Sequence, residues 1–128
     1  MKASIPILIV DDSNVVANLV KGMLQHCGFV NIASASSGEA ALSAVRRGRC
    51  KLVISDIMMP GMNGIELLRA IRADPLTQNI CVVLMTAADH PELDSAATRY
   101  QVDCLLKKPF TKDVLRQKLT EIPKLMAL

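Results

Sequence analysis

Aromatic residues and concentrated charge are scarce in this chain. Its 128 residues include no tryptophan, one tyrosine and two phenylalanines, so the aromatic platforms on which nucleic-acid-binding proteins stack bases are poorly supplied. The formal net charge is only +3, and the densest basic group consists of Arg46, Arg47, Arg49 and Lys51. We interpret this short group as a solvated helix end and expect no direct binding of nucleic acid.

Cysteine motifs and long apolar runs are missing as well. The four cysteines are far apart and show no C-x-x-C spacing, which argues against a zinc site or a disulfide framework. No apolar stretch approaches the ~18 residues of a membrane span, and the first apolar run meets Asp11 too soon for a signal peptide. We therefore expect a cytoplasmic protein with reduced thiols that makes no contact with a membrane.

What the sequence has instead is a regular alternation of short apolar runs with segments of helical periodicity. Expected strands lie at Ile5–Val10, Val30–Ala35, Leu52–Ser55, Ile80–Met85 and Asp103–Leu106. Expected helices lie at Asn14–Cys27, from the N-cap Ser36 to Arg47, and at Ile65–Ala73, Pro91–Tyr100 and Thr111–Ile122. Continuously apolar strands with helices between them predict an α/β fold, a doubly wound five-stranded parallel sheet in one domain over residues 1–128.

Helix ends carry recognisable signals. Ser36 with Glu39 predicts a capping box, Asn63 with Glu66 can cap the next helix, and Pro123 is expected to stop the last one. In the first helix, the face expected to be buried carries Val15, Val16, Leu19, Val20, Met23 and Leu24.

Polar residues follow several of the expected strands at the point where each strand ends. Asp11 and Asp12 follow the first strand, Asp56 the third, Thr86 the fourth and Lys108 the fifth. Ligands of a parallel sheet bind at the carboxyl ends of its strands, so we expect these side chains to meet. Because carboxylates repel one another, such a group needs an offsetting cation. The sequence therefore predicts a pocket that binds a divalent metal and a phosphoryl group.

Simpler and rival interpretations account for less of this pattern. The acidic pair Asp11–Asp12 could cap the first helix, but one aspartate is enough for a cap and neither explains Asp56. The glycine-rich loops of other phosphate-binding proteins, G-x-x-x-x-G-K-[ST] and G-x-G-x-x-G, are absent. A phosphatase of the haloacid-dehalogenase type would need D-x-D, and Asp56-Ile57-Met58 lacks the second aspartate.

Taken together, these residues make the chain resemble the receiver domain of two-component response regulators, in particular its single-domain chemotaxis type. The matching motifs are Asp11-Asp12, Asp56 with Met59-Pro60-Gly61 and Gly64, Thr86-Ala87 and Lys108-Pro109-Phe110. They span nearly the whole chain in the order of the family. The resemblance implies a flavodoxin-like (βα)5 fold with strand order 2-1-3-4-5.

The resemblance also implies the role of each residue. Asp56 would be the phosphoacceptor, Thr86 would hydrogen-bond the phosphoryl group, and Lys108 would pair first with Asp56 and then with the phosphoryl oxygens. The Mg²⁺ ligands would be Asp11, Asp12, Asp56 and the backbone carbonyl of Ile57. The Lys108–Pro109 bond would be cis.

For function, the resemblance implies a phosphorylation-switched regulator in a two-component phosphorelay. A histidine kinase or a phosphotransfer protein would supply the phosphoryl group, and an output protein or a fused output domain would receive the signal. The domain would not be a turnover enzyme; it would carry out only its own Mg²⁺-dependent phosphorylation and autodephosphorylation.

Three positions depart from the family pattern or modify it. Leu105 stands where many receivers carry an aromatic residue that couples to the threonine, so we expect the signal to travel through backbone shifts. Met58 and Ala88 occupy the positions that tune hydrolysis, and neither side chain can orient a water, so we expect slow autodephosphorylation. A constitutive protein–protein interaction module with a receiver fold and a non-switching site remains the alternative function.

Overall fold

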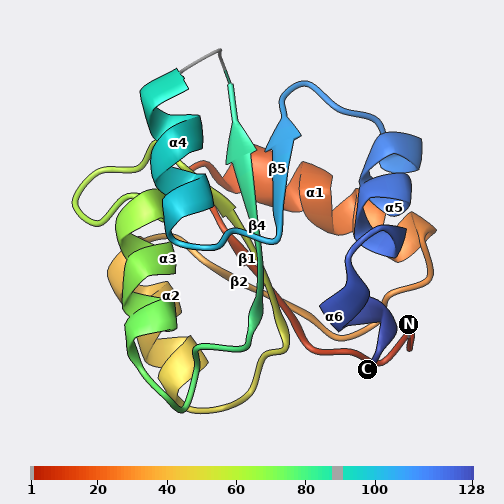
Figure 1. Ribbon diagram of the computed structural model, residues 1–128. Coiled ribbons are helices and arrows are strands. Elements are labelled where there is room, and N and C mark those ends of the chain that lie inside the picture. Colours follow the sequence, from red (N-terminus) through yellow and green to blue (C-terminus); the bar gives the residue numbers. More distant parts are fainter. Residues whose placement is uncertain (1, 88–90) are drawn as a thin grey trace.

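The computed structural model describes residues 2–87 and 91–128, in which strands and helices alternate along the chain (Figure 1). The strands are β1 (Ile7–Val10), β2 (Ile32–Ala35), β3 (Leu52–Asp56), β4 (Cys81–Thr86) and β5 (Cys104–Lys107). The helices are α1 (Asn14–His26), α2 (Gly38–Arg46), α3 (Gly64–Ala73), α4 (Pro91–Arg99), α5 (Lys112–Thr120) and α6 (Pro123–Met126). The strands form one parallel sheet in the order β2-β1-β3-β4-β5, which confirms the predicted fold class and strand order.

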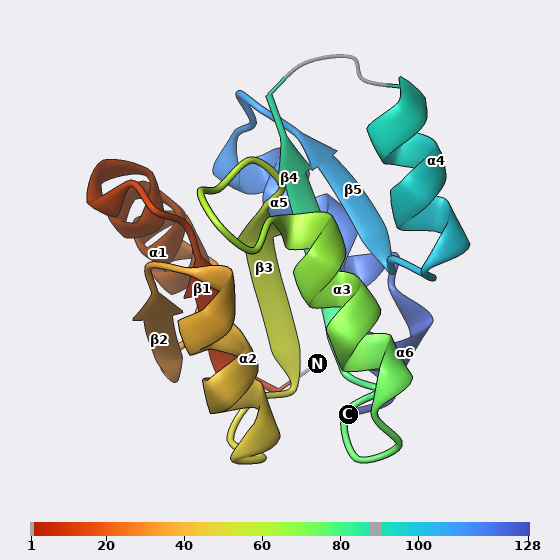
Figure 2. The same cartoon turned by 90° about the vertical axis from the view of Figure 1, so that its left-hand side faces the viewer.

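Helices cover both faces of the sheet. Helices α1 and α5 lie on one face, and α2, α3 and α4 lie on the other (Figures 1 and 2). Every residue of β1, β3 and β4 is buried, as expected for strands packed on both sides. This explains why their sequences are continuously apolar rather than alternating.

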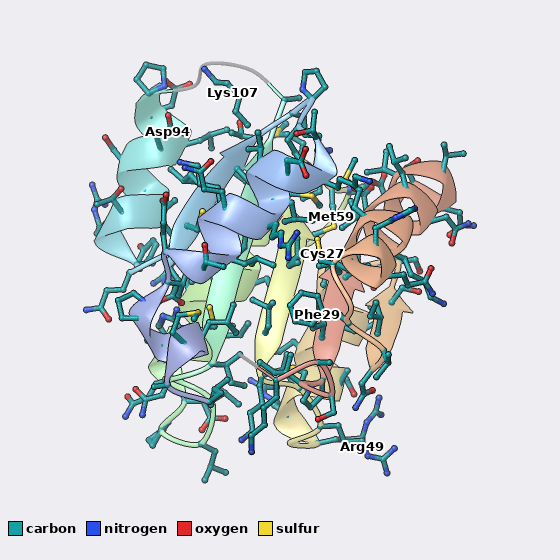
Figure 3. The ribbon with its side chains drawn as sticks, turned by 90° about the vertical axis from the view of Figure 1, so that its right-hand side faces the viewer. Cys27, Phe29, Arg49, Met59, Asp94 and Lys107 are labelled. Carbon is teal, nitrogen blue, oxygen red and sulfur yellow. The ribbon has the colours of Figure 1, made fainter. Side chains whose placement is uncertain are left out.

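Two hydrophobic layers follow from the period of two along each strand. In β1, for example, Ile7 and Ile9 belong to the layer under α1 and α5, whereas Leu8 and Val10 belong to the layer under α2 and α3. Phe29, in the segment that follows α1, fills the first layer, where Figure 3 shows its ring between the helices and the sheet. Fully burying an aliphatic or aromatic side chain of this size contributes about 1.5–3 kcal/mol.

Side chains cap the starts of α1, α2, α3 and α5, with one difference from the sequence prediction. Asn63 and Glu66 form the capping box of α3, in which the Glu66 N–H donates to Asn63 Oδ1 at 2.8 Å and the Asn63 N–H to Glu66 Oε1 at 3.1 Å. The capping box predicted for Ser36 and Glu39 was wrong. The N-cap of α2 is Ser37, which places Glu39 one position too early in the helix to close a box.

The ends of several elements differ from the prediction. The first strand begins at Ile7 rather than Ile5, because Pro6 has no N–H for the ladder. Helix α5 ends at Thr120, and Pro123 begins the short helix α6 instead of only stopping the preceding one. Proline favours the first turn of a helix, where its missing N–H costs nothing.

The apolar surface of α1 is wider than the part that is buried. Val15 and Leu19 were expected to share the buried face, but they are 79% and 59% exposed. Ala17, Val20 and Leu24 are the residues of α1 that are buried. Within the described part of the chain, no helix is long and apolar enough to cross a bilayer.

Candidate functional site

The predicted site residues lie at the carboxyl edge of the sheet. Asp11 follows β1, Asp56 ends β3, Thr86 ends β4 and Lys108 follows β5. Backbone pairing continues at this edge. The Asp11 N–H donates to the Ala35 carbonyl at 3.1 Å, and the Lys108 N–H donates to the Thr86 carbonyl at 2.7 Å. These hydrogen bonds fix the site residues to the neighbouring strands and give their side chains a rigid base.

Three carboxylates converge at this edge. One oxygen from each of Asp11, Asp12 and Asp56 lies within 4.8 Å of the others. Asp11 and Asp56 are buried, whereas Asp12 is exposed. Three negative charges at such a separation repel one another strongly, and burial adds the cost of desolvation.

Lys108 supplies the positive charge that faces this cluster. Its Nζ lies 3.2 Å from Asp56 Oδ1 and 3.8 Å from Asp11 Oδ2. The cis Lys108–Pro109 peptide bond implied by the family resemblance is present. One ammonium offsets only part of the charge of three carboxylates.

The surroundings of Asp11 act on its carboxyl in opposing directions. Burial raises the pKa of this carboxyl above its usual range, a hydrogen bond from the Ser13 N–H at 2.9 Å lowers it, and the charges of Asp56 and Asp12 raise it. Lys108 acts in the lowering direction. Asp11 Oδ2 is buried and accepts no hydrogen bond from the described residues. A buried carboxylate oxygen without a donor, beside two more carboxylates, fits the oxygen ligands that a hard divalent cation requires.

The loop after β3 begins next to the cluster, and a hydrogen bond joins its two ends. The Ile57 N–H donates to the Met85 carbonyl at 3.0 Å, and the Ile57 carbonyl accepts from the Gly64 N–H at 2.9 Å. A carbonyl oxygen has a second lone pair, so this bond leaves Ile57 able to accept another partner. A Cβ at Gly64 would collide with the Asp56 carbonyl oxygen, which requires glycine there.

The remaining predicted residues lie around this centre. Thr86 is buried, one residue beyond the pair formed by Asp56 and Met85 in the sheet. Met58 follows Asp56 by two residues, and its side chain is 61% exposed. Leu105 is half-buried and packs in the layer under α2, α3 and α4. Ala88, the other position expected to tune hydrolysis, lies outside the described residues.

Sequence reasoning missed two contributors to this edge. Glu39 on α2 accepts the Met62 N–H at 2.8 Å, so α2 holds the loop after β3. Ser13 supplies the backbone donor to Asp11. Glu39 stood out in the sequence only as half of a local capping pattern, and no local signal pointed to its distant partner. Ser13 could have been found, because an aspartate followed two residues later by a helix N-cap often accepts that residue's N–H.

Comparisons with known proteins agree with this geometry. The sequence model of the response regulator receiver domain matches residues 7–120. The chemotaxis protein CheY of Pseudomonas aeruginosa is 38% identical over 116 residues, which cover 91% of this chain and 94% of that protein. The chemotaxis protein CheY-3 of Vibrio cholerae is 37% identical over 122 residues, which cover 95% of this chain and 94% of that protein.

A solved structure is similar over the same range. The chemotaxis protein CheY4 of Vibrio cholerae superposes with a TM-score of 0.85 at 28% identity, covering 93% of this chain and 98% of that chain. The fold, the convergent edge of the sheet and the family match point to one assignment: the chain belongs to the response regulator receiver domain family and is of the chemotaxis type.

Proposed function

We propose that this receiver domain is a signalling switch in which Asp56 accepts a phosphoryl group from a phosphohistidine of a partner protein. The observation that carries the proposal is the convergence of three carboxylates within 4.8 Å of one another, with the Lys108 ammonium 3.2 Å from Asp56. Such an arrangement is unfavourable for stability alone, because the like charges are only partly offset. It suits a site that binds a cation and a phosphoryl group.

Receiver domains bind Mg²⁺ at an acidic pocket, and the residues of this chain fit the ion. The ligands we propose are Asp11, Asp12, Asp56 and the Ile57 carbonyl. When bound, Mg²⁺ supplies the positive charge that lets an anionic carboxylate approach an anionic phosphoryl group. The unpartnered Asp11 Oδ2 supports this assignment.

The transfer step uses Asp56 as a carboxylate nucleophile. One Asp56 oxygen forms a bond to phosphorus while the phosphorus–nitrogen bond to the donor imidazole breaks, and the electron pair stays with the imidazole. Lys108 orients the Asp56 carboxylate through its 3.2 Å contact and then pairs with the phosphoryl oxygens. The protein contributes mainly position and charge, which is what phosphoryl transfer requires. Receiver domains are signalling domains rather than turnover enzymes, and here the chemistry is limited to self-phosphorylation and autodephosphorylation.

The output step follows from the added charge. A phosphoryl group brings about −1.5 to −2 charge and three acceptor oxygens. In the proposed switch the Thr86 hydroxyl donates to one of these oxygens and draws the end of β4 with it. The carboxyl ends of β4 and β5 then adopt a second arrangement. The population of that arrangement is set by its extra contacts with the phosphoryl group.

The partners that fit this scheme are a histidine kinase or a phosphotransfer protein as donor and an output protein or fused output domain as receiver. The similarity to two chemotaxis proteins supports a place in two-component signalling. We place the domain, residues 1–128, in the cytoplasm, with no direct role in nucleic-acid or membrane binding.

A non-switching interaction module is the second candidate, and Leu105 is the observation that favours it. Without an aromatic side chain at this position, an aromatic rotation cannot accompany movement of Thr86. In that case phosphorylation would leave the surface of α4 and β5 unchanged.

The test is phosphorylation by a small phosphodonor, such as acetyl phosphate, in the presence of Mg²⁺. We expect a mass gain of one phosphoryl group that is absent in Asp56→Asn and retained in the matched control Asp113→Asn, an exposed aspartate on α5. Amide NMR spectra should then shift at Thr86 and in β5. Absence of any mass gain, or a gain that survives in Asp56→Asn, would refute the phosphoacceptor assignment. A phosphorylated protein with an unchanged spectrum at Thr86 and β5 would favour the non-switching module.

A further inference from the structure

A groove of about 550 Å³ lies between the edge strand β2 and helix α2, and none of the three clustered aspartates lines it. Figure 2 shows α2 lying in front of β1 and β2, with β2 at the rim of the sheet. The groove is lined by the main chain of β2, by one side of α2 and by the segment that leads into β3. Its floor includes two buried residues, Leu8 of β1 and Cys50 in the segment before β3.

The outer edge of β2 offers unused backbone hydrogen-bonding groups. The Ile7 N–H donates to the Asn31 carbonyl, and the Asp11 N–H donates to the Ala35 carbonyl. Because backbone groups alternate sides along a strand, Ile32 and Ser34 direct their N–H and C=O groups away from β1. No described strand pairs with this edge. The strand Ile32–Ala35 also contains neither lysine nor proline, the residues with which many proteins block an open edge.

Small side chains keep the groove open beside this edge. Ala33 and Ala35 from β2 and Ala40 and Ala44 from α2 line it. A cleft between an edge strand and a helix is a geometry in which an extended peptide can be added to a sheet: main-chain hydrogen bonds supply affinity, and alternate side chains enter the cleft. The alanines leave room for those side chains.

The charged side chains that line the groove are both positive. Its charged lining residues are Arg47 and Arg49, which are both exposed and have no ion-pair partner among the described residues. They lie toward the amino end of β2, because α2 runs back toward that end and Arg49 lies three residues before the start of β3 at Leu52. Figure 3 shows Arg49 at the end of the molecule opposite Lys107, the last residue of β5. Guanidinium groups match the geometry of carboxylates and form charge-assisted hydrogen bonds with them.

We propose that this groove binds an extended acidic segment of a partner protein. The segment adds as a strand to the outer edge of β2, antiparallel to it, so that its carboxyl-terminal part reaches Arg47 and Arg49. Its alternate side chains fill the space beside the alanines. A second copy of this chain is a poorer occupant, because the chain itself has a net charge of +3. The interaction uses none of the residues of the phosphorylation site and is separate from the function proposed above.

The test uses labelled peptides and the intact 128-residue chain. The probe is a peptide of alternating valine and threonine that ends in two glutamates with a free carboxylate. The matched peptide ends in two glutamines and an amide. We expect saturable binding of the acidic peptide by fluorescence anisotropy, much weaker binding of the glutamine peptide, and amide shifts confined to β2 and to the carboxyl-terminal half of α2.

Two sets of variants separate this site from general charge attraction. Arg47→Glu and Arg49→Glu should each weaken binding by about tenfold or more, the effect of losing one charge-assisted hydrogen bond. Arg46→Glu is the matched control, because Arg46, the last residue of α2, carries the same charge next to Arg47 but does not line the groove. Ser34→Pro should abolish binding by removing an outward N–H without disturbing the pairing with β1, whereas Ser34→Ala keeps that N–H and should bind normally.

Several results would overturn the proposal. The first is that Arg46→Glu weakens peptide binding as much as Arg49→Glu does, and the second is equal affinity for the two peptides. The others are amide shifts centred on α4 and β5, and no binding at millimolar peptide concentration. Self-association of the chain through β2 in the absence of peptide would identify a second copy as the occupant and would also overturn it. Phosphorylation of Asp56 can succeed or fail independently of each of these results.

Discussion

At the scale of single residues, the acidic edge of the sheet is arranged to bind a cation, and the same arrangement is unfavourable for folding without one. Asp11 accepts one backbone hydrogen bond through Oδ1, yet its Oδ2 is buried without a donor and faces Lys108 only at 3.8 Å. In the metal-free protein this arrangement stores unfavourable electrostatic energy. A bound cation would release that energy, so the same atoms are expected to reduce stability without metal and to increase it with metal.

Asp11→Asn tests this opposition directly. The pKa of Asp11 is raised in the folded protein. The protonated carboxyl therefore contributes to the free energy of unfolding at low pH, and this contribution is lost as the pH rises through the raised pKa. We therefore expect Asp11→Asn to unfold at a higher temperature than the parent at neutral pH without Mg²⁺. The advantage should shrink toward acid pH, and Mg²⁺ should stabilise the parent much more than the variant. Thermal unfolding across pH and Mg²⁺ concentration measures these effects, with Asp113→Asn as the control. A variant that is less stable than the parent without Mg²⁺ would contradict this account.

Met58 provides a second prediction at this scale. Its side chain is 61% exposed two residues after Asp56, and a thioether cannot position a water for attack on an acyl phosphate. An amide at this position can donate and accept hydrogen bonds. We expect Met58→Asn to shorten the lifetime of the phosphorylated protein several-fold, measured by the loss of phosphoryl mass with time. Met126→Asn, an exposed methionine on α6, should leave the lifetime unchanged. An unchanged decay rate in Met58→Asn would show that this position does not limit hydrolysis.

At the scale of elements, the loop between β3 and α3 is held from two sides. The bond from the Gly64 N–H to the Ile57 carbonyl joins its two ends, and Glu39 accepts the N–H of Met62, near the end that leads into α3, at 2.8 Å. Gly38 allows this approach, because a Cβ there would lie 2.6 Å from the Met62 carbonyl oxygen. Helix α2 therefore supports the loop that follows the proposed phosphoacceptor.

Glu39→Ala should remove this support. We expect a loss of about 1–2 kcal/mol in the free energy of unfolding, the usual effect of leaving a backbone donor without its charged acceptor. Glu39→Gln keeps an acceptor oxygen and should lose clearly less. Denaturant unfolding gives the energies, and hydrogen exchange of the Met62 amide reports the contact itself. If Gln is as harmful as Ala, charge rather than hydrogen bonding is what matters at this position.

Some elements and contacts could be predicted from the sequence, and others could not. The buried strands β1, β3 and β4 were predictable because their apolar runs are unbroken, and the capping box of α3 was predictable because all of its atoms come from four consecutive residues. The cap of α2 was not, because the S-x-x-E pattern of a capping box selects Ser36, whereas the neighbouring Ser37 is the N-cap. The partner of Glu39 depends on how two distant segments pack, and no local period encodes that contact.

At the scale of the whole molecule, the two ends of the sheet differ in their chemistry. The carboxyl edge holds the partly compensated acidic cluster, whose convergence was predictable because the carboxyl ends of parallel strands lie together. The amino end is held by a compensated network that the sequence did not reveal. Arg72 on α3 donates to Asp103 Oδ2 at 2.8 Å and to the Ile80 carbonyl at 2.6 Å. Asp103 also accepts the Val82 N–H at 2.8 Å, and Lys124 near the C-terminus lies 3.3 Å from its Oδ1.

This contrast predicts that substitutions at the amino end of the sheet change stability but leave the phosphorylation chemistry at the carboxyl end intact. Arg72 and Asp103 are only 9% and 13% exposed, and Arg72→Met leaves the Asp103 carboxylate with only the more exposed Lys124 and the Val82 N–H as partners, so it should cost about 3 kcal/mol. Lys124 is 41% exposed, and Lys124→Met should cost under about 1 kcal/mol. Denaturant unfolding of both variants tests the difference.

Because this network lies at the end opposite Asp56, both variants, where folded, should still gain one phosphoryl group from acetyl phosphate. Equal costs for the two variants would show that the buried pair is no stronger than the exposed one. Loss of phosphorylation in folded Arg72→Met would show that the two ends of the sheet are coupled.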